Sequence, residues 1–266
     1  MFSITEDIPV RFINGQQIPA RARILPDSLM MVLSTQQSID AMEKEMMDAI
    51  GSVEDWLHMS RTDSLAFDAG TGLLKAVSFY YPELNRDPGN LHLLKTAEKT
   101  VGIPQLETDA PAFELIPFEY RYYQEERDLL LCFDDRFMEV EQLQEIAISN
   151  EVSLFFSNGQ YCAWGVYHPE VLLTNHIGAT TAYNADAFLK ACFQEAFALI
   201  TDETVEQMRE HDGQALRKIA ALHNRIVAHG AVVDSPLQVL KEWLFSLADK
   251  FYREKELDGL FNEGSA

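Results

Sequence analysis

The spacing of hydrophobic residues changes along the chain, and this change restricts the fold more than any other feature. Before residue 177, short runs of aromatic and β-branched residues are separated by turn residues, whereas residues 184–260 carry apolar stripes at steps of three and four. The first pattern is typical of strands and the second of helices. We therefore predict an α+β fold, with antiparallel, strand-rich N-terminal and central parts that include one packed helix, followed by a helical C-terminal third.

Residues 1–84 are predicted to form a hairpin, a helix and a second hairpin. Asn14-Gly15 is the favoured pair for a tight hairpin turn, and apolar residues alternate behind it from Ile18 to Ile24. An apolar stripe from Ile39 to Leu57 predicts the helix. The hydroxyl of Ser38 would cap its first turn.

Residues 85–112 are the candidate boundary, because proline and glycine are denser there than elsewhere. They would form a linker or a long loop within one continuous domain. Residues 113–176 follow as a β-rich, acidic part, in which Ser157-Asn158-Gly159 predicts a hairpin turn and residues 140–146 a short helix. No internal repeat is found in the sequence.

The C-terminal third, residues 184–260, shows three helical stripes with start and stop signals. Asn184 is the expected cap of the first helix, and Gly230 is expected to end the second. Ser235 followed by Pro236 predicts the start of the third, because the hydroxyl can cap the helix and proline lacks an amide that would otherwise be unsatisfied.

The composition is that of a folded chain, since 47% of the 266 residues are hydrophobic and disordered chains lack such apolar content. No apolar run reaches the roughly 18 residues that a membrane helix requires. The first residues show neither the basic nor the apolar segment of a signal peptide. The three cysteines, Cys132, Cys162 and Cys192, are few and far apart, which indicates reduced thiols in a cytoplasmic protein.

Acidic residues outnumber basic ones two to one. The chain has 42 Asp and Glu against 21 Lys and Arg, a formal net charge of −21 at pH 7. Direct binding to a nucleic-acid backbone or an anionic membrane is therefore not expected, because each phosphate contact needs a lysine or arginine. The charge suits a basic protein as partner.

Part of this charge is concentrated between residues 105 and 151, where thirteen Asp and Glu face three Arg, a net charge of −10. The segment also contains several tyrosines, which are common at interfaces because they combine contact area with a polar tip. We predict that acidic and tyrosine side chains of this segment bind the partner. These residues are Glu114, Glu119, Tyr120, Tyr122, Tyr123, Glu125, Glu126, Asp128, Asp134 and Asp135.

The functional hypothesis is a cytoplasmic inhibitor of the immunity or antitoxin kind, which covers the basic site of a toxin or nuclease. Its acidic surface would imitate the phosphates that such a site normally meets. The alternative for each residue is the solvated face of a sheet, because most exposed charges have no partner.

Two other classes of function stay open. Asp134 and Asp135 could hold a divalent cation in a hydrolase, although an Asp-rich turn is the commoner explanation for such a pair. An adaptor could use the amphipathic helix from Pro236 to Tyr252 to dock a partner. The sequence contains no nucleophile elbow, phosphate loop or dinucleotide fingerprint. We therefore expect no catalytic residues, no metal ligands and no cofactor.

Overall fold

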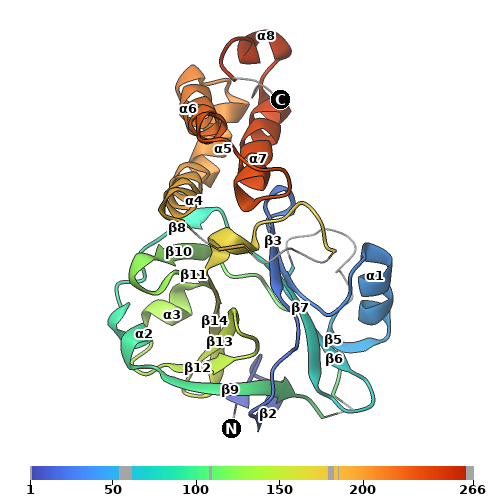
Figure 1. Ribbon diagram of the computed structural model, residues 1–266. Helices are drawn as coiled ribbons and strands as arrows, with labels where there is room; N and C mark the ends of the chain where they lie inside the picture. Colours follow the sequence, from blue (N-terminus) through green and yellow to red (C-terminus); the bar gives the residue numbers. More distant parts are fainter. Residues whose placement is uncertain (1, 54–61, 108–109, 179–182, 185, 262–266) are drawn as a thin grey trace.

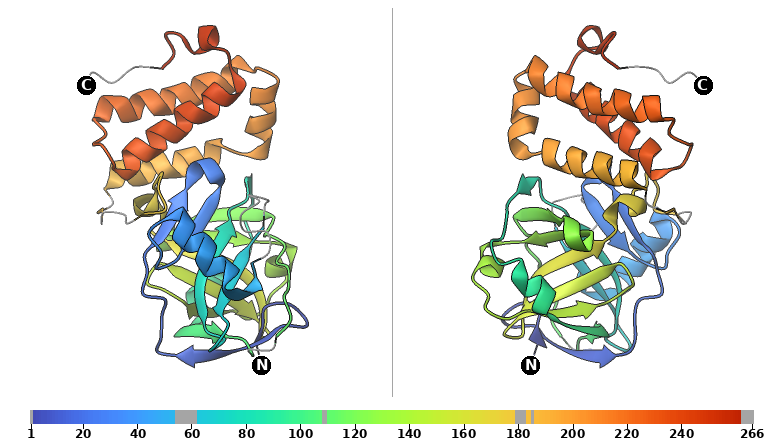
Figure 2. Two further views of the ribbon diagram at one scale, coloured as in Figure 1. Left: turned by 90° about the vertical axis from the view of Figure 1, so that its right-hand side faces the viewer. Right: turned by 60° about the vertical axis from the view of Figure 1, so that its left-hand side comes forward.

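Two β-sheets and a separate helical part make up the molecule (Figure 1). The computed structural model describes residues 2–53, 62–107, 110–178, 183–184 and 186–261. The strands precede residue 168, and the helices α4 to α8 form the C-terminal third, at one end of the strand-rich part (Figures 1 and 2). The predicted α+β fold is confirmed.

The larger sheet is mixed and has nine strands. Strand β1 pairs with both β2 and β14, so β1, β2, β9, β12, β13 and β14 form a closed ring of six strands. This ring lies at the end of the molecule opposite the helices (Figure 1). In spatial order the nine strands are β1 (Phe2–Ser3), β2 (Pro9–Asn14), β9 (Glu98–Gln105), β12 (Gln144–Ala147), β13 (Val152–Ser157), β14 (Gln160–Tyr167), β11 (Leu129–Phe133), β10 (Tyr120–Gln124) and β8 (Leu84–Asn85).

The smaller sheet is antiparallel throughout and packs against the larger one. Phe79 of the smaller sheet stacks on Trp164 of the larger, with ring centroids 5.1 Å apart, and both side chains are fully buried. The main apolar core therefore lies between the two sheets and continues to the C-terminal helices. The five strands in order are β3 (Ala22–Leu25), β4 (Met30–Leu33), β7 (Leu74–Tyr80), β6 (Ser64–Asp68) and β5 (Ala49–Ser52).

The same strand topology occurs twice in the chain. The order β3-β4-β7-β6-β5 in the smaller sheet is matched by β10-β11-β14-β13-β12 in the larger, with every neighbouring pair antiparallel. Each unit has a short 3-10 turn between its first two strands, and the turn is followed by a left-handed residue, Leu29 or Asp128. A helix follows the second strand of each unit, α1 (Ile39–Met47) or α3 (Asp135–Met138). The repeat is one of strand order and connection, and no internal repeat is found in the sequence.

The two units also exchange their exit segments. After its last strand each unit has a Tyr-x-Pro-Glu sequence, at residues 80–83 and 167–170. The first exit leads to β8, which pairs in parallel with β10 of the second unit. The second leads through the 3-10 turn η4 (Pro169–Leu172) to Leu173, which forms a parallel bridge with Ile24 of the first unit. Each unit thus extends the edge of the other.

The described residues of the C-terminal third form five helices, and the apolar stripes of the long ones point inward. Ser235 caps α7 as predicted, because its hydroxyl accepts a hydrogen bond from the Gln238 amide at 3.2 Å. Gly230 ends α6 with a positive φ. Asp186, rather than the predicted Asn184, caps α4. The helices are α4 (Ala187–Leu199), α5 (Asp202–Arg209), α6 (Gly213–His229), α7 (Pro236–Phe251) and α8 (Glu254–Leu257).

The predicted hairpin at Asn14-Gly15 is wrong, whereas the one at Asn158-Gly159 is confirmed. Strand β2 pairs with β1 and β9, and β3 belongs to the other sheet. Both edges of β2 are therefore occupied by strands that are not its neighbours across the turn. Asn158 and Gly159 connect β13 and β14 with positive φ at both residues, as a tight hairpin turn of this type requires.

Two predicted helices also differ. The helix capped by Ser38 forms, but it ends at Met47 and is followed by β5, while residues 54–61 lie outside the described part. Gly51 in β5 has φ +116° and lies so close to the carbonyl of Leu65 that a Cβ atom would come within 2.4 Å. Residues 144–147 form β12 rather than the end of a helix, because β9 and β13 flank them.

A fully buried arginine joins the larger sheet to the helical part. The guanidinium of Arg121 in β10 donates to the carbonyl oxygen of Phe197 at 2.9 Å and to that of Ile200, at the C-terminal end of α4. It also donates to the side chain of Asn85, whose own amide donates to the Phe197 carbonyl at 2.8 Å. The last carbonyls of a helix have no partner within the helix and favour a cation.

Candidate functional site

A groove of about 460 Å³ lies between β10 and α4. It combines residues from the acidic segment with residues from the first helix of the C-terminal third. The groove forms here because Arg121 holds the end of α4 against the sheet. Its lining residues are Asn85, Tyr122, Tyr123, Glu125, Leu130, Ala191, Gln194, Glu195, Phe197 and Ala198.

Tyr122 and Tyr123 are neighbours in β10, so their side chains leave the strand on opposite faces. Tyr123 faces α4, where its ring meets Phe193 edge to face at 5.7 Å between centroids and its hydroxyl donates to Asp128 at 2.8 Å. Burial, and after it the hydrogen bond to Asp128, raises the pKa of Tyr123. Burial, and after it the carboxylates of Asp87 and Glu125, raises the pKa of Tyr122. Both phenols therefore stay neutral at physiological pH.

Carboxylates stand on both sides of this groove. Glu125 comes from the 3-10 turn η3 (Glu125–Arg127) that follows β10, and Glu195 comes from α4. Both are exposed, and Glu195 also contacts Arg225 of α6. The described lining residues include no lysine, arginine or histidine. Two carboxylates beside aromatic rings form a site suited to a lysine or arginine side chain, which can pair with a carboxylate and rest on a ring face.

Three of the predicted partner-binding residues, Tyr122, Tyr123 and Glu125, line this groove. Tyr120 lies on the same face of β10 as Tyr122, and the guanidinium of Arg86 covers its ring at 4.5 Å. Arg86 also pairs with Asp135 at 2.9 Å. Glu119 is exposed beside Tyr120, and burial together with the carboxylates of Glu119 and Asp135 raises the pKa of Tyr120.

The structure places the other predicted carboxylates elsewhere or pairs them within the chain. Glu126 forms an ion pair with Lys95. Asp128 accepts from Lys190 as well as from Tyr123. Asp134 caps α3 through the Arg136 amide at 2.9 Å and pairs with the guanidinium of the same arginine.

Glu114 lies apart from the groove. It lines a smaller cavity, of about 260 Å³, together with Asp63. Asp63 is 1% exposed, and burial raises its pKa to about 8, although the Tyr80 amide donates to its carboxylate at 2.8 Å. The ten predicted residues therefore do not form one continuous surface.

Glu145, another carboxylate of the acidic segment, is 1% exposed and cannot contact a partner. Lys99 and Arg127 pair with it at 2.6 and 3.0 Å, and the hydroxyl of Tyr167 donates to it at 2.7 Å. Burial alone would raise its pKa, but the hydrogen bonds from Lys99 and Tyr167 hold the pKa below the ordinary value. Glu145 therefore connects residues inside the larger sheet and does not form part of its accessible surface.

The sequence did not indicate the residues that α4 and β8 add to the groove. Asn85, Gln194 and Glu195 lie 37 or more positions from Tyr122, and none belongs to a recognisable motif. Only the alternation of apolar and polar positions in α4 places Glu195 on a solvent-facing side.

The described residues contain no candidate metal site and no candidate membrane span. No group of three or more His, Cys, Asp or Glu there could hold a metal ion. None of the helices in that part of the chain is long and apolar enough to cross a membrane. Comparison with known proteins returned no significant match to a protein-family model, a curated protein or a solved structure.

Proposed function

We propose that this chain is an acidic binding protein that docks a basic protein through the groove between β10 and α4. The partner would place a lysine or arginine side chain against Glu125, beside the ring of Tyr123, with Glu195, which also pairs with Arg225, on the other side of the groove. An inhibitor of the immunity or antitoxin kind is the class we favour, because covering a basic site of a toxin or nuclease calls for this chemistry.

The observation that carries the proposal is the composition of the groove. It offers carboxylates on two elements, aromatic rings and side-chain amides, with no cation among the described lining residues. The whole chain has a formal net charge of −21, so a basic partner is attracted over a range set by a Debye length of about 8 Å at physiological salt. An anionic ligand such as a nucleic acid would be repelled.

The ion pairs around the groove limit which carboxylates can contact the partner directly. Glu126, Asp128, Asp134 and Asp135 already have cationic partners within the chain. A cation of the partner would have to compete with the existing one at each of these carboxylates, so each offers less than an unpaired carboxylate would. Glu125 has no ion pair among the described residues, which makes it the best candidate for a direct contact.

A cytoplasmic location is part of the proposal. Cys132, Cys162 and Cys192 are all free and buried, as expected for a protein kept under reducing conditions. Burial raises the pKa of each thiol, so none is set up as a reactive thiolate.

The adaptor hypothesis has less support. The apolar stripe of α7 is buried inside the molecule, including Leu240, Trp243 and Leu244. The helix therefore uses within the chain the face that an adaptor would offer. Phe245, 41% exposed, is the large apolar residue that remains at its surface.

Partner capture tests the proposed function. The immobilised native chain is exposed to a cell lysate at low and at high salt, and the retained proteins are identified. We expect the retained proteins to be basic and to be released at high salt, because charge attraction is screened there. Retention of neutral or acidic proteins, or retention that ignores salt, would contradict the proposal.

The captured partner then allows the groove itself to be tested. Glu125→Gln removes a charge that lines the groove, whereas Glu126→Gln removes the neighbouring charge, which is paired with Lys95. We expect Glu125→Gln to raise the dissociation rate about tenfold and the matched control to change it little, because a lost charge-assisted contact acts mainly on dissociation. Equal effects of the two variants would move the contact away from the groove.

A further inference from the structure

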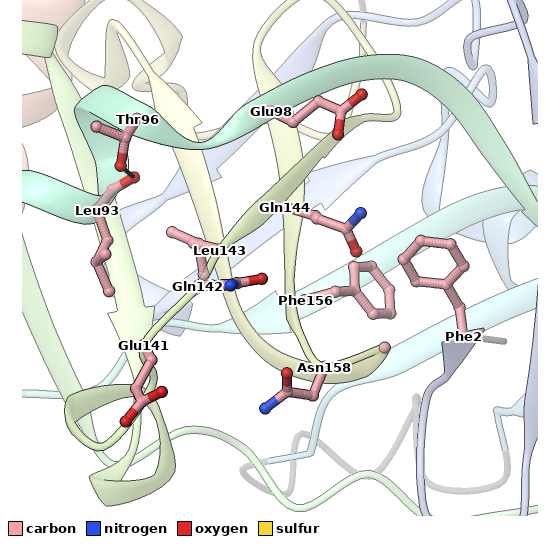
Figure 3. Close-up of a pocket in the computed structure, with 11 residues that line it drawn as sticks. Phe2, Leu93, Thr96, Glu98, Glu141, Gln142, Leu143, Gln144, Phe156 and Asn158 are labelled. Atoms are coloured by element: carbon pink, nitrogen blue, oxygen red, sulfur yellow. Dashed lines mark hydrogen bonds between the residues drawn. The ribbon is translucent and has the colours of Figure 1, made fainter.

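A second cavity, of about 560 Å³, opens at one end of the six-stranded ring (Figure 3). It lies among β1, β9, β12 and the β13–β14 turn, far along the larger sheet from the groove beside α4. Cavities of this size at the mouth of a closed sheet are common sites for small molecules. None of its lining residues belongs to the groove between β10 and α4.

The strand register sets one wall of the cavity. Gln144 of β12 is paired with Glu98 of β9 on one side and with Phe156 of β13 on the other. Directly paired residues point to the same face of a sheet, so the three side chains form a row across three strands. Phe2 of β1 extends this row, since its ring meets that of Phe156 at 5.3 Å between centroids.

The opposite wall comes from the segment before β12 and from the hairpin turn. Glu141 and Gln142 lie on this segment, and Asn158 lies in the turn between β13 and β14. In Figure 3, Glu98 and Glu141 stand at opposite sides of the cavity, with Gln142 and Leu143 between them and Gln144 and Phe156 on the side toward Phe2. Both glutamates are exposed, and neither has an ion pair among the described residues.

The cavity therefore offers acceptors and apolar rings, and no positive charge comes from its described lining residues. The carboxylates of Glu98 and Glu141 lie at opposite sides of the cavity. The side-chain amides of Gln142, Gln144 and Asn158 line the same cavity. The lysines nearest in sequence do not supply a counter-charge, because Lys95 pairs with Glu126 and Lys99 with Glu145.

We propose that this cavity binds a linear organic diamine or polyamine. One ammonium group would be held at Glu98 and another at Glu141, because each ammonium carries three donors and no acceptor. The methylene chain between them would lie along Leu143, an apolar lining residue that stands between the two glutamates in Figure 3. An anion would be repelled by both carboxylates, and a neutral sugar would leave them without counter-charge. The site is independent of the proposed docking of a basic protein.

Calorimetric titration of the full chain tests this proposal with spermidine and 1,4-diaminobutane as probes. We expect saturable binding of one molecule of either probe. Butylamine carries one ammonium on a similar chain and is expected to bind at least about tenfold more weakly, since it loses one charge-assisted contact. A neutral trisaccharide is expected not to bind.

Paired variants separate the cavity from general charge attraction. Glu98→Gln with Glu141→Gln removes both carboxylates of the cavity, while Glu210→Gln with Glu254→Gln removes two exposed carboxylates elsewhere. We expect the first pair to weaken spermidine binding at least about tenfold and the control pair to weaken it less than about twofold. All four positions are exposed, so glutamine is expected to leave the melting temperature nearly unchanged.

Three outcomes would overturn the proposal. The first is no saturable binding of either probe. The second is an equal loss of spermidine affinity in the cavity double variant and the control double variant. This would attribute the binding to the net charge of the protein. The third is displacement of spermidine by magnesium at equal ionic strength as readily as by 1,4-diaminobutane, because a compact cation cannot span the two glutamates.

Discussion

Glu170 in η4 is a buried carboxylate in an unusual environment. It is fully buried, and neither carboxylate oxygen has a hydrogen-bond partner on another described residue. Burial is the largest cause that raises its pKa, and the charge of Asp128 adds to it, while its own backbone amide, His168 and Lys190 act in the opposite direction. An ionised carboxylate without hydrogen bonds is costly in such a place.

Glu170→Gln is therefore expected to stabilise the protein at neutral pH by about 1–2 kcal/mol, because the amide carries no charge for burial to penalise, although it too lacks a partner. The raised pKa means that folding favours the protonated acid. The contribution of Glu170 to protein stability is therefore fully present below the ordinary pKa of 4.5. It is lost as the pH rises through the pKa of Glu170 in the folded protein. The glutamine amide cannot ionise, so the stability of the variant relative to wild type increases as the pH rises and decreases in acid.

Urea unfolding of Glu170→Gln and wild type at acid and neutral pH measures this difference. Glu254→Gln, at an exposed position, is the control and is expected to follow wild type at both pH values. A variant that is less stable than wild type at neutral pH would show that the buried carboxylate is stabilised by its surroundings.

At the scale of elements, local signals predicted local structure well. Ser38, Ser235 and Gly230 occupy the cap positions that their side chains or backbone conformations favour, and these depend on a few neighbouring residues. Pairing with distant strands was not predictable in the same way. The turn at Asn14-Gly15 fails because β1 and β9 occupy both edges of β2, and β9 follows it by more than 80 residues.

The contact between β10 and α4 shows the same limit for the candidate site. Tyr122, Tyr123 and Glu125 were predicted from the density of acid and tyrosine in one segment, but Glu195 was not. The groove exists because Arg121 is buried under the end of α4. An arginine within an acidic segment would ordinarily be interpreted as a surface residue, so nothing in the sequence pointed to this contact.

Arg121→Met is expected to weaken the attachment of α4 by about 2–4 kcal/mol, because the carbonyls of Phe197 and Ile200 and the side chain of Asn85 lose a buried donor. Hydrogen exchange should report faster opening of the last turn of α4 than in wild type. Arg217→Met, at an exposed site in α6, is the matched control and should leave that turn protected. Unchanged exchange in Arg121→Met would mean that apolar packing alone holds the helix.

At the scale of the whole molecule, charge counted along the sequence differs from charge on the surface. The net charge of −10 between residues 105 and 151 suggested one acidic patch, yet cations from outside this segment neutralise several of its members. These cations are Arg86, Lys95, Lys99 and Lys190. Sequence counting cannot include them, because they reach the segment only through strand pairing and helix packing.

The duplicated topology was hidden for a related reason. A strand order is fixed by which edges meet, and many apolar sequences satisfy the same order. Between the two units the shared signature is short, the Tyr-x-Pro-Glu exit at residues 80–83 and 167–170. The amide before each proline donates to the left-handed residue of its own unit, Tyr81 to Leu29 at 3.0 Å and His168 to Asp128 at 2.7 Å. The proline exit is thus tied to the turn that follows the first strand.

The exchange of exit segments predicts that the two units unfold together. Phe79→Ala removes the ring that stacks on Trp164 between the sheets and is expected to cost about 3–5 kcal/mol. Because β8 and Leu173 tie each unit to the other, hydrogen exchange should show equal losses of protection in β4 and β7 and in β11 and β14. A different result would contradict this: amide protection falls in the smaller sheet and stays unchanged in the larger one. The two units would then unfold separately, and the exchanged segments would connect them without coupling their stability.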